Sequence, residues 1–458
     1  SVALTWSHGQ ATPRSTPLPP AREQQQERRP THRRGRRTEN RSRRGLSGLM
    51  AEEKKPHPQP PPSWSALRLD LAGLVLSLLP VYADCACFAA VCPQWRAAAR
   101  QLQLPPLPLL ALPDGTFYSL MYDKPFHFPG CGFSGYENVC GSWLIFSRDD
   151  GCFMVNPFSR ATVTLPALSS VRLRPPNASA KSKWAEGGSV ESANLYITWM
   201  RINEADNLRI SKLILCSPNL VAALVGIGPI SQILMCQPGA LSWSVRAYDR
   251  IEDFQDMSFY QGKLYAIAKD ENLLVVNISQ DHSTGDPQVS RIGRVIEGDC
   301  PTWYDAVFED NSSACKKLYL VESRGMLLMV RRTIWCQFPE PGGDGKIMGG
   351  QNEFEVFEAD FEHSRWVKVS TVGDDQVLFL GRRCSRSMSV SQYGLPGDRI
   401  FFLDDDEDNR LDYAYDEEKT SFGVYSMRFR SIGSGDPNIS WKRCAEMYLA
   451  AWLFPQDR

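Results

Sequence analysis

Two related stretches decide the fold, KLYAIAKDENLLVVNI (263–278) and KLYLVESRGMLLMVRR (317–332). Each begins with an apolar run that contains a tyrosine, continues through a short polar turn and ends in a second apolar run. Apolar runs on both sides of a tight polar turn are typical of a β-hairpin. The two stretches therefore predict two antiparallel hairpins, and their likeness predicts that the chain repeats one structural unit.

The same pattern returns along the C-terminal three quarters of the chain, in WLIFSRDDGCFMVNP (143–157), ILMCQPGALSWSVRAY (233–248), FEVFEADFEHSRWVKVS (354–370) and RIFFLDDD (399–406). Leu264 and Leu318, at equivalent places in the two opening hairpins, lie 54 positions apart, and a four-stranded propeller blade takes about 40–50 residues. The 345 residues of 114–458 therefore suffice for about six or seven blades. A β-sandwich is the alternative, but a closed ring protects the edges of so many short strands better. We predict a β-propeller.

The N-terminal residues 1–63 differ in composition from the rest. Residues 1–50 contain eleven Arg, no Lys and three Glu, a net charge of +8, so that the remaining residues carry −9. This polar, Arg- and Pro-rich segment is predicted to be disordered. The first methionine is Met50, and we expect residues 1–49 to be translated upstream sequence; a nuclear-import signal at RRGRR (33–37) is the alternative. The acidic remainder argues against nucleic-acid binding there.

Residues 64–102 have the periodicity of helices. One apolar stripe recurs at spacings of three and four, and Pro80 is expected to end its helix; its members are Leu67, Leu71, Leu74, Val75, Leu78 and Leu79. A second stripe follows, made of Phe88, Val91, Cys92, Trp95 and Ala99. About forty residues are too few for a stable isolated core. We therefore expect this unit to cover its apolar surface with another body, and the Pro-rich stretch 103–113 is predicted to be a linker.

The helical segment WSALRLDLAGLVLSLLPVYADCACFAAVCPQWRAAA (64–99) resembles a plant F-box. The residues that follow the family pattern in order are Leu67, Asp70, Leu71, Val75, Leu76, Leu79, Pro80, Val91, Cys92, Trp95 and Arg96. Arg68 stands where the family usually has proline, and Leu78 where it usually has arginine. The alternative is a plain helical hairpin packed on the β domain.

The F-box resemblance implies a role for each residue of the two stripes. F-boxes dock onto a Skp-type adaptor, which connects them to a cullin-RING ubiquitin ligase. The adaptor-binding residues would be Leu67, Asp70, Leu71, Leu74, Val75, Leu78, Leu79 and Pro80. The residues of the F-box core would be Phe88, Val91, Cys92, Trp95 and Arg96.

Residues 114–455 resemble the KIB-type β-propeller that follows an F-box in many plant proteins. The most specific matches are the NPFS…LP turn (156–166), VESRGMLLMVRR (321–332) and the FLG…CSRS…IFFLDDD run (379–406). Together the two resemblances imply an α + all-β protein, a three-helix F-box followed by a propeller that binds a protein substrate. Its expected partners are a Skp-type adaptor, a cullin and that substrate, with no nucleic acid and no membrane. The alternatives are a ligase-independent interaction protein with a degenerate F-box, and a propeller enzyme.

No pattern of catalytic or metal-binding residues stands out, so we predict a non-enzyme with no catalytic residues, no cofactor and no metal. The six His are widely separated, and Cys and His do not reach zinc-ligand spacing. Thirteen cysteines without a C-x-x-C pair suggest reduced thiols in the cytoplasm or nucleus. The apolar run 71–79 is about half a membrane span.

Two charged motifs leave alternatives open. DDDEDN (404–409) has the alternation of a calcium loop but lacks the glycine and the final glutamate of one, and we favour an exposed acidic loop. RRCSR (382–386) could pair with an acidic or phosphorylated partner, and we favour a solvated turn. The long polar segments 168–188 and 339–352 are candidate recognition loops.

Overall fold

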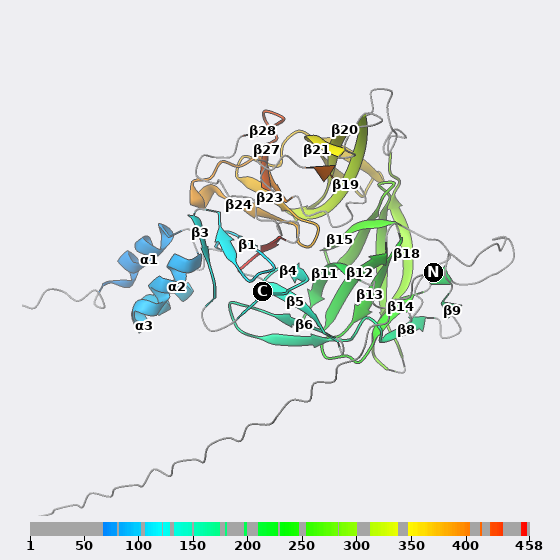
Figure 1. The fold of residues 1–458 in the computed structure, drawn as a ribbon, viewed down its shortest axis with the longest axis horizontal. Coiled ribbons are helices and arrows are strands. Elements are labelled where there is room, and N and C mark those ends of the chain that lie inside the picture. The colour runs from blue at the N-terminus through cyan, green and yellow to red at the C-terminus, as the bar shows by residue number, and fades with distance from the viewer. Residues whose placement is uncertain are drawn as a thin grey trace, which may run out of the picture. The chain divides into compact units, whose positions relative to one another are not determined.

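The computed structural model describes residues 67–79, 82–101, 106–120, 122–128, 132–148, 151–174, 179–180, 197–198, 209–227, 230–246, 253–282, 284–299, 312–337, 347–403, 413–414, 422–433 and 450–455 (Figure 1). The chain divides into two units, 1–61 and 62–458, and the described residues all belong to the second. The predicted disorder of residues 1–63 and the acidic stretch 404–409 therefore lie outside the described residues.

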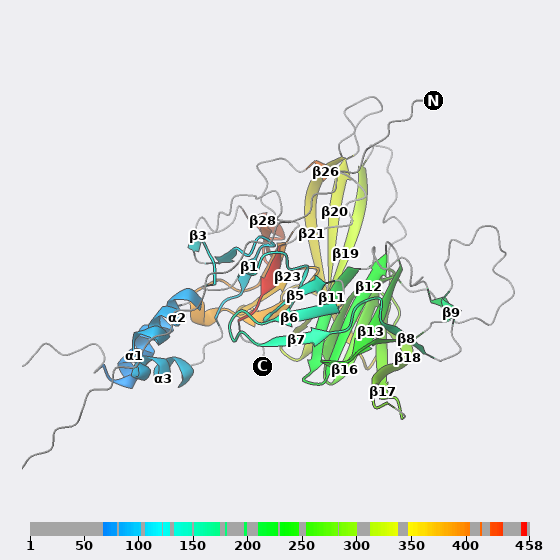
Figure 2. The same cartoon turned by 60° about the horizontal axis from the view of Figure 1, so that its bottom comes forward.

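Three short helices begin the described chain: α1 (Leu69–Ser77), α2 (Tyr82–Val91) and α3 (Pro93–Gln101). Figure 2 shows them side by side. Pro93 separates α2 from α3 because proline is favoured at the first position of a helix and cannot continue the one before it. Ala72, Leu76, Phe88 and Ala98 form a small buried core made by the helices alone.

The remaining strands form six sheets of four or five strands among the described residues, together with the short pair β9 (Ser179–Ala180) and β10 (Ile197–Thr198). The first two sheets are β29 (Ala451–Leu453), β1 (Leu109–Ala111), β2 (Phe117–Ser119), β3 (Tyr122–Phe126); and β4 (Asn138–Cys140), β5 (Trp143–Arg148), β6 (Gly151–Val155), β7 (Thr162–Leu165). The next two are β11 (Arg209–Ser217), β12 (Leu220–Ile227), β13 (Ile230–Cys236), β14 (Trp243–Arg246), β8 (Val171–Arg174); and β15 (Phe254–Tyr260), β16 (Lys263–Ala268), β17 (Leu273–Gln280), β18 (Pro287–Ile296). The last two are β19 (Ser312–Ser323), β20 (Met326–Gln337), β21 (Ile347–Asp360), β22 (Arg365–Val369), with β26 (Tyr413–Ala414) beside β21; and β24 (Arg386–Ser389), β23 (Gln376–Leu380), β25 (Arg399–Leu403), β27 (Phe422–Ser426), β28 (Ser431–Gly433).

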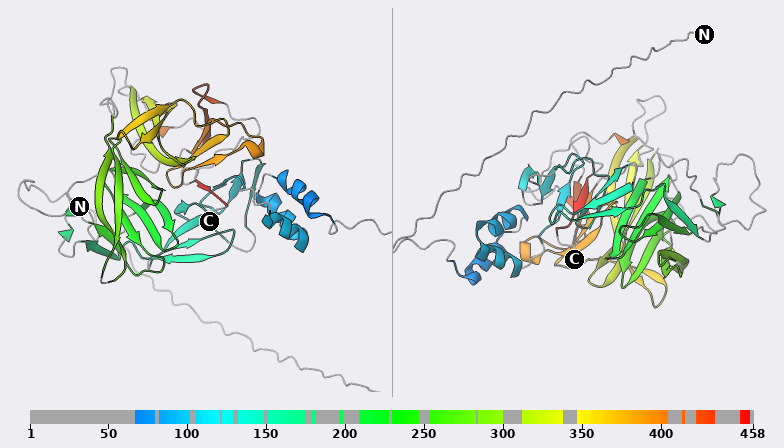
Figure 3. Two further views of the ribbon diagram at one scale, coloured as in Figure 1. Left: turned by 180° about the vertical axis from the view of Figure 1, so that it is seen from behind. Right: turned by 90° about the horizontal axis from the view of Figure 1, so that it is seen from below.

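The six sheets are the blades of a propeller, which confirms the predicted fold class. The innermost strands β29, β4, β11, β15, β19 and β24 contact one another in succession, and Figure 3 shows the sheets arranged around a common centre. The ring closes within the first blade, where β29 from the C-terminal end pairs antiparallel with β1, Leu110 opposite Trp452. Residues more than 300 positions apart thus complete one sheet.

Each blade is buried on both faces. In β1, Leu110 packs against the last blade, whereas Leu109 and Ala111 pack against the second. The same alternation in β23 sends Val377 and Phe379 to one neighbouring blade and Leu378 and Leu380 to the other, because successive side chains of a strand point to opposite faces. This is why β1 and β23, each the second strand of its blade, are continuous apolar runs in the sequence.

The hairpins predicted from the two opening stretches, and those at 143–157, 233–248 and 354–370, are all present. The turn between β19 and β20 places Arg324 and Gly325 at φ values of 51° and 75°. Two successive positive φ values give the two-residue turn whose twist matches paired strands, and glycine adopts them readily.

Three boundaries expected from the sequence are wrong. The propeller begins at Leu109 and not at 114, because the stretch LLA between the prolines of 103–113 is a buried strand. Residues 347–352 of the expected loop 339–352 are the start of β21. Residues 171–174 of the expected loop 168–188 form β8, which pairs parallel with β14.

Candidate functional site

The helix α1 presents an uncovered apolar face. Leu71 is 45 % exposed, Leu74 63 % and Leu78 78 %, and Val75 is also exposed. On the opposite side of the same helix, Ala72 and Leu76 are buried in the helical core. The structure therefore brings together on one side of α1 four of the residues predicted to bind the adaptor, each of them more than a third exposed.

The other four predicted adaptor-binding residues lie differently. Leu67 and Leu79 are partly buried against the helical core, so they support α1 more than they extend its exposed face. Asp70 is exposed and forms an ion pair with Arg68, 2.9 Å between Nη2 and Oδ2. Slight desolvation raises the pKa of Asp70, but hydrogen bonds from Arg68 and from the backbone of Leu71 outweigh it, so the pKa is lowered. Pro80 lies outside the described residues.

The predicted F-box core is only partly a core. Phe88 is buried, and its ring stacks on that of Trp95 at a centroid distance of 4.4 Å, which fastens α2 to α3. The Cys92 sulfur accepts the Trp95 backbone N–H at 3.4 Å, at the start of α3. The prediction is wrong for Val91, the last residue of α2, which is 53 % exposed, because α2 contributes Phe88 and not Val91 to the buried helical core. Arg96 is exposed too, and its Nε donates to the Ala89 carbonyl at 3.1 Å.

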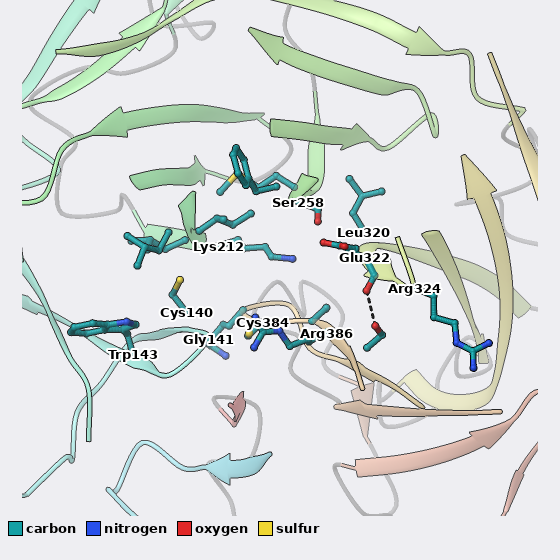
Figure 4. Close-up of a pocket in the computed structure, with 18 residues that line it drawn as sticks. Cys140, Gly141, Trp143, Lys212, Ser258, Leu320, Glu322, Arg324, Cys384 and Arg386 are labelled. Atoms are coloured by element: carbon teal, nitrogen blue, oxygen red, sulfur yellow. Dashed lines mark hydrogen bonds between the residues drawn. The ribbon is translucent and has the colours of Figure 1, made fainter. Parts of the chain in front are cut away.

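A second candidate site is a cavity of about 480 Å³ at the centre of the propeller. The innermost strands and the segment 383–387 line it. Its cationic residues are Lys212, Arg324, Arg383 and Arg386, and its acidic residue is Glu322. In Figure 4, Lys212 and Glu322 point toward the middle of the cavity from opposite sides, and Cys384 and Arg386 lie along a third, whereas Arg324 extends away from the others.

The last four residues of the motif RRCSR (382–386) form part of the wall of this cavity, and the interpretation of the motif as a solvated turn is wrong. Arg383 is buried, and its Nε donates to the Glu137 carbonyl at 3.0 Å. Cys384 packs against two of the hydrophobic clusters. Arg386, the last residue of the motif, begins β24, the innermost strand of its blade, so the motif lies at the centre of the ring and not at its outer rim.

A buried ion pair separates this cavity from a second one of about 240 Å³. Lys212 lines the first cavity and Asp256 the second, and Lys212 Nζ lies 2.5 Å from Asp256 Oδ1. Asp256 Oδ2 accepts the Leu320 N–H at 2.7 Å. Burial raises the pKa of Asp256, and the hydrogen bonds from Lys212 and the backbone act against this shift. The pair ties β11, β15 and β19 together across the channel.

Sequence reasoning missed Lys212, Asp256 and Glu322 as residues of a site. Lys212 and Asp256 each stand alone in a strand without a motif around them, and Glu322 lies in the hairpin stretch 317–332, where the pattern indicates only the end of a strand. A lysine or an aspartate within an apolar strand is a signal of a buried polar contact, but its partner cannot be read from the sequence, because Lys212 and Asp256 are 44 positions apart.

Within the described ranges, His, Cys, Asp and Glu side chains nowhere gather in groups of three or more that could hold a metal ion. The helices described in the structure are also too short or too polar to cross a membrane.

Comparison with known proteins identifies the propeller. A family model described as KIB1-4 beta-propeller matches residues 109–426, which begins at the first residue of β1 and excludes α1–α3. A search of curated proteins finds no match to the chain. The family match covers well over half of the chain and includes strands of all six blades, ending before β28 and β29, and the chain therefore belongs to the KIB1-4 beta-propeller family.

Proposed function

We propose that this chain is the substrate-recognition subunit of an SCF-type cullin-RING E3 ubiquitin ligase. In this proposal α1–α3 are an F-box of the type found in plants and dock onto a Skp-type adaptor, and the propeller binds a protein substrate. The observation that carries the proposal is the exposed face of α1, where the Leu74 and Leu78 side chains are mostly exposed while Leu76 of the same helix is buried.

The physical support is the amount of apolar surface left in water. The helix α1 has one buried apolar side and one exposed apolar side. Such an exposed side is typical of a helix that binds in the apolar groove of a partner protein. Fully burying a leucine side chain contributes about 1.5–3 kcal/mol. Several such leucines on one helix therefore favour association of α1 with a partner protein that has an apolar groove.

The proposal assigns no catalytic step to this chain. The ubiquitin transfer belongs to the enzymes that the cullin recruits, and the propeller holds the substrate near them. A cytoplasmic or nuclear location is part of the proposal, since cullin-based ligases act there.

A second candidate function is a ligase-independent interaction protein with a degenerate F-box. Its support is Arg68, which stands where the F-box family usually has proline, but the backbone geometry weakens that support. The backbone of Arg68 has a φ of −61° and precedes a regular first turn of α1. This is the φ that proline imposes, so the backbone is as it would be with the usual proline. Co-purification of a cullin with the wild-type chain would exclude the second candidate.

The test uses Leu74→Asp and Leu78→Asp in the full chain, with Leu241→Asp as the matched control. Leu241 is 92 % exposed in the propeller, so all three variants place a charge on an exposed leucine position. We expect Leu74→Asp and Leu78→Asp to weaken capture of a purified Skp-type adaptor by about tenfold or more, since buried anchors contribute about 2–4 kcal/mol. Leu241→Asp should bind as the wild type does. Undiminished adaptor binding by the α1 variants would reject the proposal.

A further inference from the structure

We propose that the wall formed by residues 383–387 in the central cavity binds a peptide segment that carries a phosphorylated or acidic side chain. The inference deepens the proposed function and rests on it in one respect, that the segment comes from the protein substrate. The binding itself is a property of the cavity and is tested separately.

The first support is the sign of the charge. Four cationic residues and one carboxylate line the cavity. Two of these cations are paired, Lys212 with Asp256 and Arg324 with Asp375, and cationic side chains outnumber carboxylates in the lining. The chain beyond residue 50 carries −9. A cationic hollow in an acidic domain concentrates anions at its mouth.

The second support is the kind of cation. Arginine holds phosphate and carboxylate groups through paired N–H donors. Arg383 is buried and oriented by its hydrogen bond to the Glu137 carbonyl. Arg386 is exposed, with its guanidinium 5.3 Å from the centre of the Phe454 ring. Arg383 is therefore held in place within the wall, and Arg386 is exposed at the surface, where it can contact an anionic group of a ligand.

The third support is the size and the mixed lining of the cavity. A volume of about 480 Å³ lies in the range of about 300–1,000 Å³ that holds a small molecule or a few side chains. Trp143 and Phe259, which are both partly exposed, supply apolar lining. A peptide with an apolar residue next to an anionic one satisfies both parts of the lining, which inorganic phosphate does not.

The side chain of Glu322 provides a further test of whether the cavity binds an anionic peptide. Its carboxylate points into the cavity (Figure 4), where it opposes an anionic ligand. Its backbone carbonyl accepts the Ser387 hydroxyl at 2.7 Å, a contact that a change of side chain leaves in place. Glu322→Gln should therefore bind the anionic peptide more tightly than the wild type, by about twofold to tenfold.

The probe is a pool of short fluorescent peptides with randomised flanks around one fixed central residue. Three pools differ only in that residue, which is phosphothreonine, glutamate or threonine. Binding to the purified full chain is followed by anisotropy, at low and at high salt. We expect the phosphothreonine and glutamate pools to bind at least about tenfold more tightly than the threonine pool, and to weaken as salt screens the charges.

The variants are Arg386→Glu and Arg386→Gln, the second being the milder change in case charge reversal disturbs the fold. Arg294→Glu and Arg294→Gln on β18 are the matched controls, because Arg294 is exposed and does not line the cavity. Both Arg386 variants should weaken binding of the phosphothreonine pool by about tenfold or more, and the Arg294 variants by less than about twofold.

Equal binding of the three pools, or unchanged binding by both Arg386 variants, would overturn the inference. Equal affinity for inorganic phosphate and for the phosphothreonine pool would overturn the assignment to a peptide. The variant Leu78→Asp separates this inference from the proposed function. Leu78→Asp should bind the phosphothreonine pool as the wild type does and lose adaptor binding. Arg386→Gln should bind the adaptor as the wild type does and bind the phosphothreonine pool more weakly.

Discussion

Lys212 and Asp256 form a buried ion pair between the innermost strands β11 and β15, with 2.5 Å between Nζ and Oδ1. The other carboxylate oxygen of Asp256 accepts the Leu320 N–H of β19. One carboxylate therefore joins three neighbouring blades at the centre of the ring. The strands themselves run from the second cavity to the first, since residues 254–256 line the second and residues 257–259 the first.

Removal of the Asp256 carboxylate should destabilise the propeller strongly. Asp256→Ala leaves the Lys212 ammonium buried without its partner, and breaking a buried pair in this way costs about 3–5 kcal/mol. The double variant Lys212→Met, Asp256→Leu should recover most of that loss, because replacing both charges by apolar groups is often neutral. Urea unfolding measures both. A double variant no more stable than Asp256→Ala would contradict the expectation.

Acid should weaken the contact between Glu355 and its cationic neighbours. Arg331 Nη1 donates to Glu355 at 2.8 Å and Lys368 Nζ donates to its other oxygen. Partial burial raises the pKa of Glu355, but these contacts outweigh it and lower the pKa below 4.5. The lowered pKa stabilises the fold fully above pH 4.5, and this contribution is lost as the pH falls through the lowered value.

Glu355→Gln should therefore show a smaller decline in unfolding free energy than the wild type as the pH falls from about 6 to about 3. Urea unfolding at several pH values checks this. Identical pH profiles for the two proteins would show that Glu355 makes no such contribution.

The cysteines should differ widely in their reactivity toward alkylating reagents. Burial raises the pKa of Cys216 to about 12 and also raises that of Cys236, so neither forms the reactive thiolate near neutral pH. Cys87 on α2 is exposed. Brief treatment with iodoacetamide, followed by mass spectrometry, should label Cys87 first and leave Cys216 and Cys236 unlabelled. In urea all three should react, and early labelling of Cys236 in the folded protein would contradict the buried site.

Two leucines of α1 should respond oppositely to the same substitution. Leu76→Asp places a charge in the helical core, where an unpaired charge is strongly disfavoured. Leu78→Asp places it in water. We expect Leu76→Asp to give fast amide exchange throughout residues 69–101, and Leu78→Asp to keep the exchange rates of the wild type. Equal exchange in both variants would mean that α1 does not pack as the structure shows.

The ring closure should depend on Trp452 of β29. Its side chain is fully buried, its Nε1 donates to the Leu380 carbonyl at 3.0 Å, and its ring lies 5.2 Å from that of Phe379. Trp452→Ala should lower the unfolding free energy by about 3–5 kcal/mol. Trp452→Phe keeps most of the apolar volume and should cost about 1–2 kcal/mol. Urea unfolding distinguishes the two, and a Trp452→Ala variant as stable as the wild type would contradict the closure.

Much of the fold could be predicted from local patterns. The hairpin 317–332 is predictable because two apolar runs and the turn residues Arg324 and Gly325 specify it without help from distant parts of the chain. The stop between α2 and α3 follows in the same way from Pro93. The apolar stripe of α1 was also visible, but the stripe alone does not tell which leucines are covered.

The sequence by itself determined the helices, the hairpins and the repeated unit of a propeller, because these depend on residues close together in the chain. The tertiary structure alone decided that Leu76 is buried and Leu78 exposed, that β29 completes the blade of β1, and that residues 383–386 of RRCSR line the central cavity. Each of these depends on segments brought together across long stretches of chain. The free energy of such contacts depends on what surrounds a side chain, which its own neighbours in the sequence do not specify.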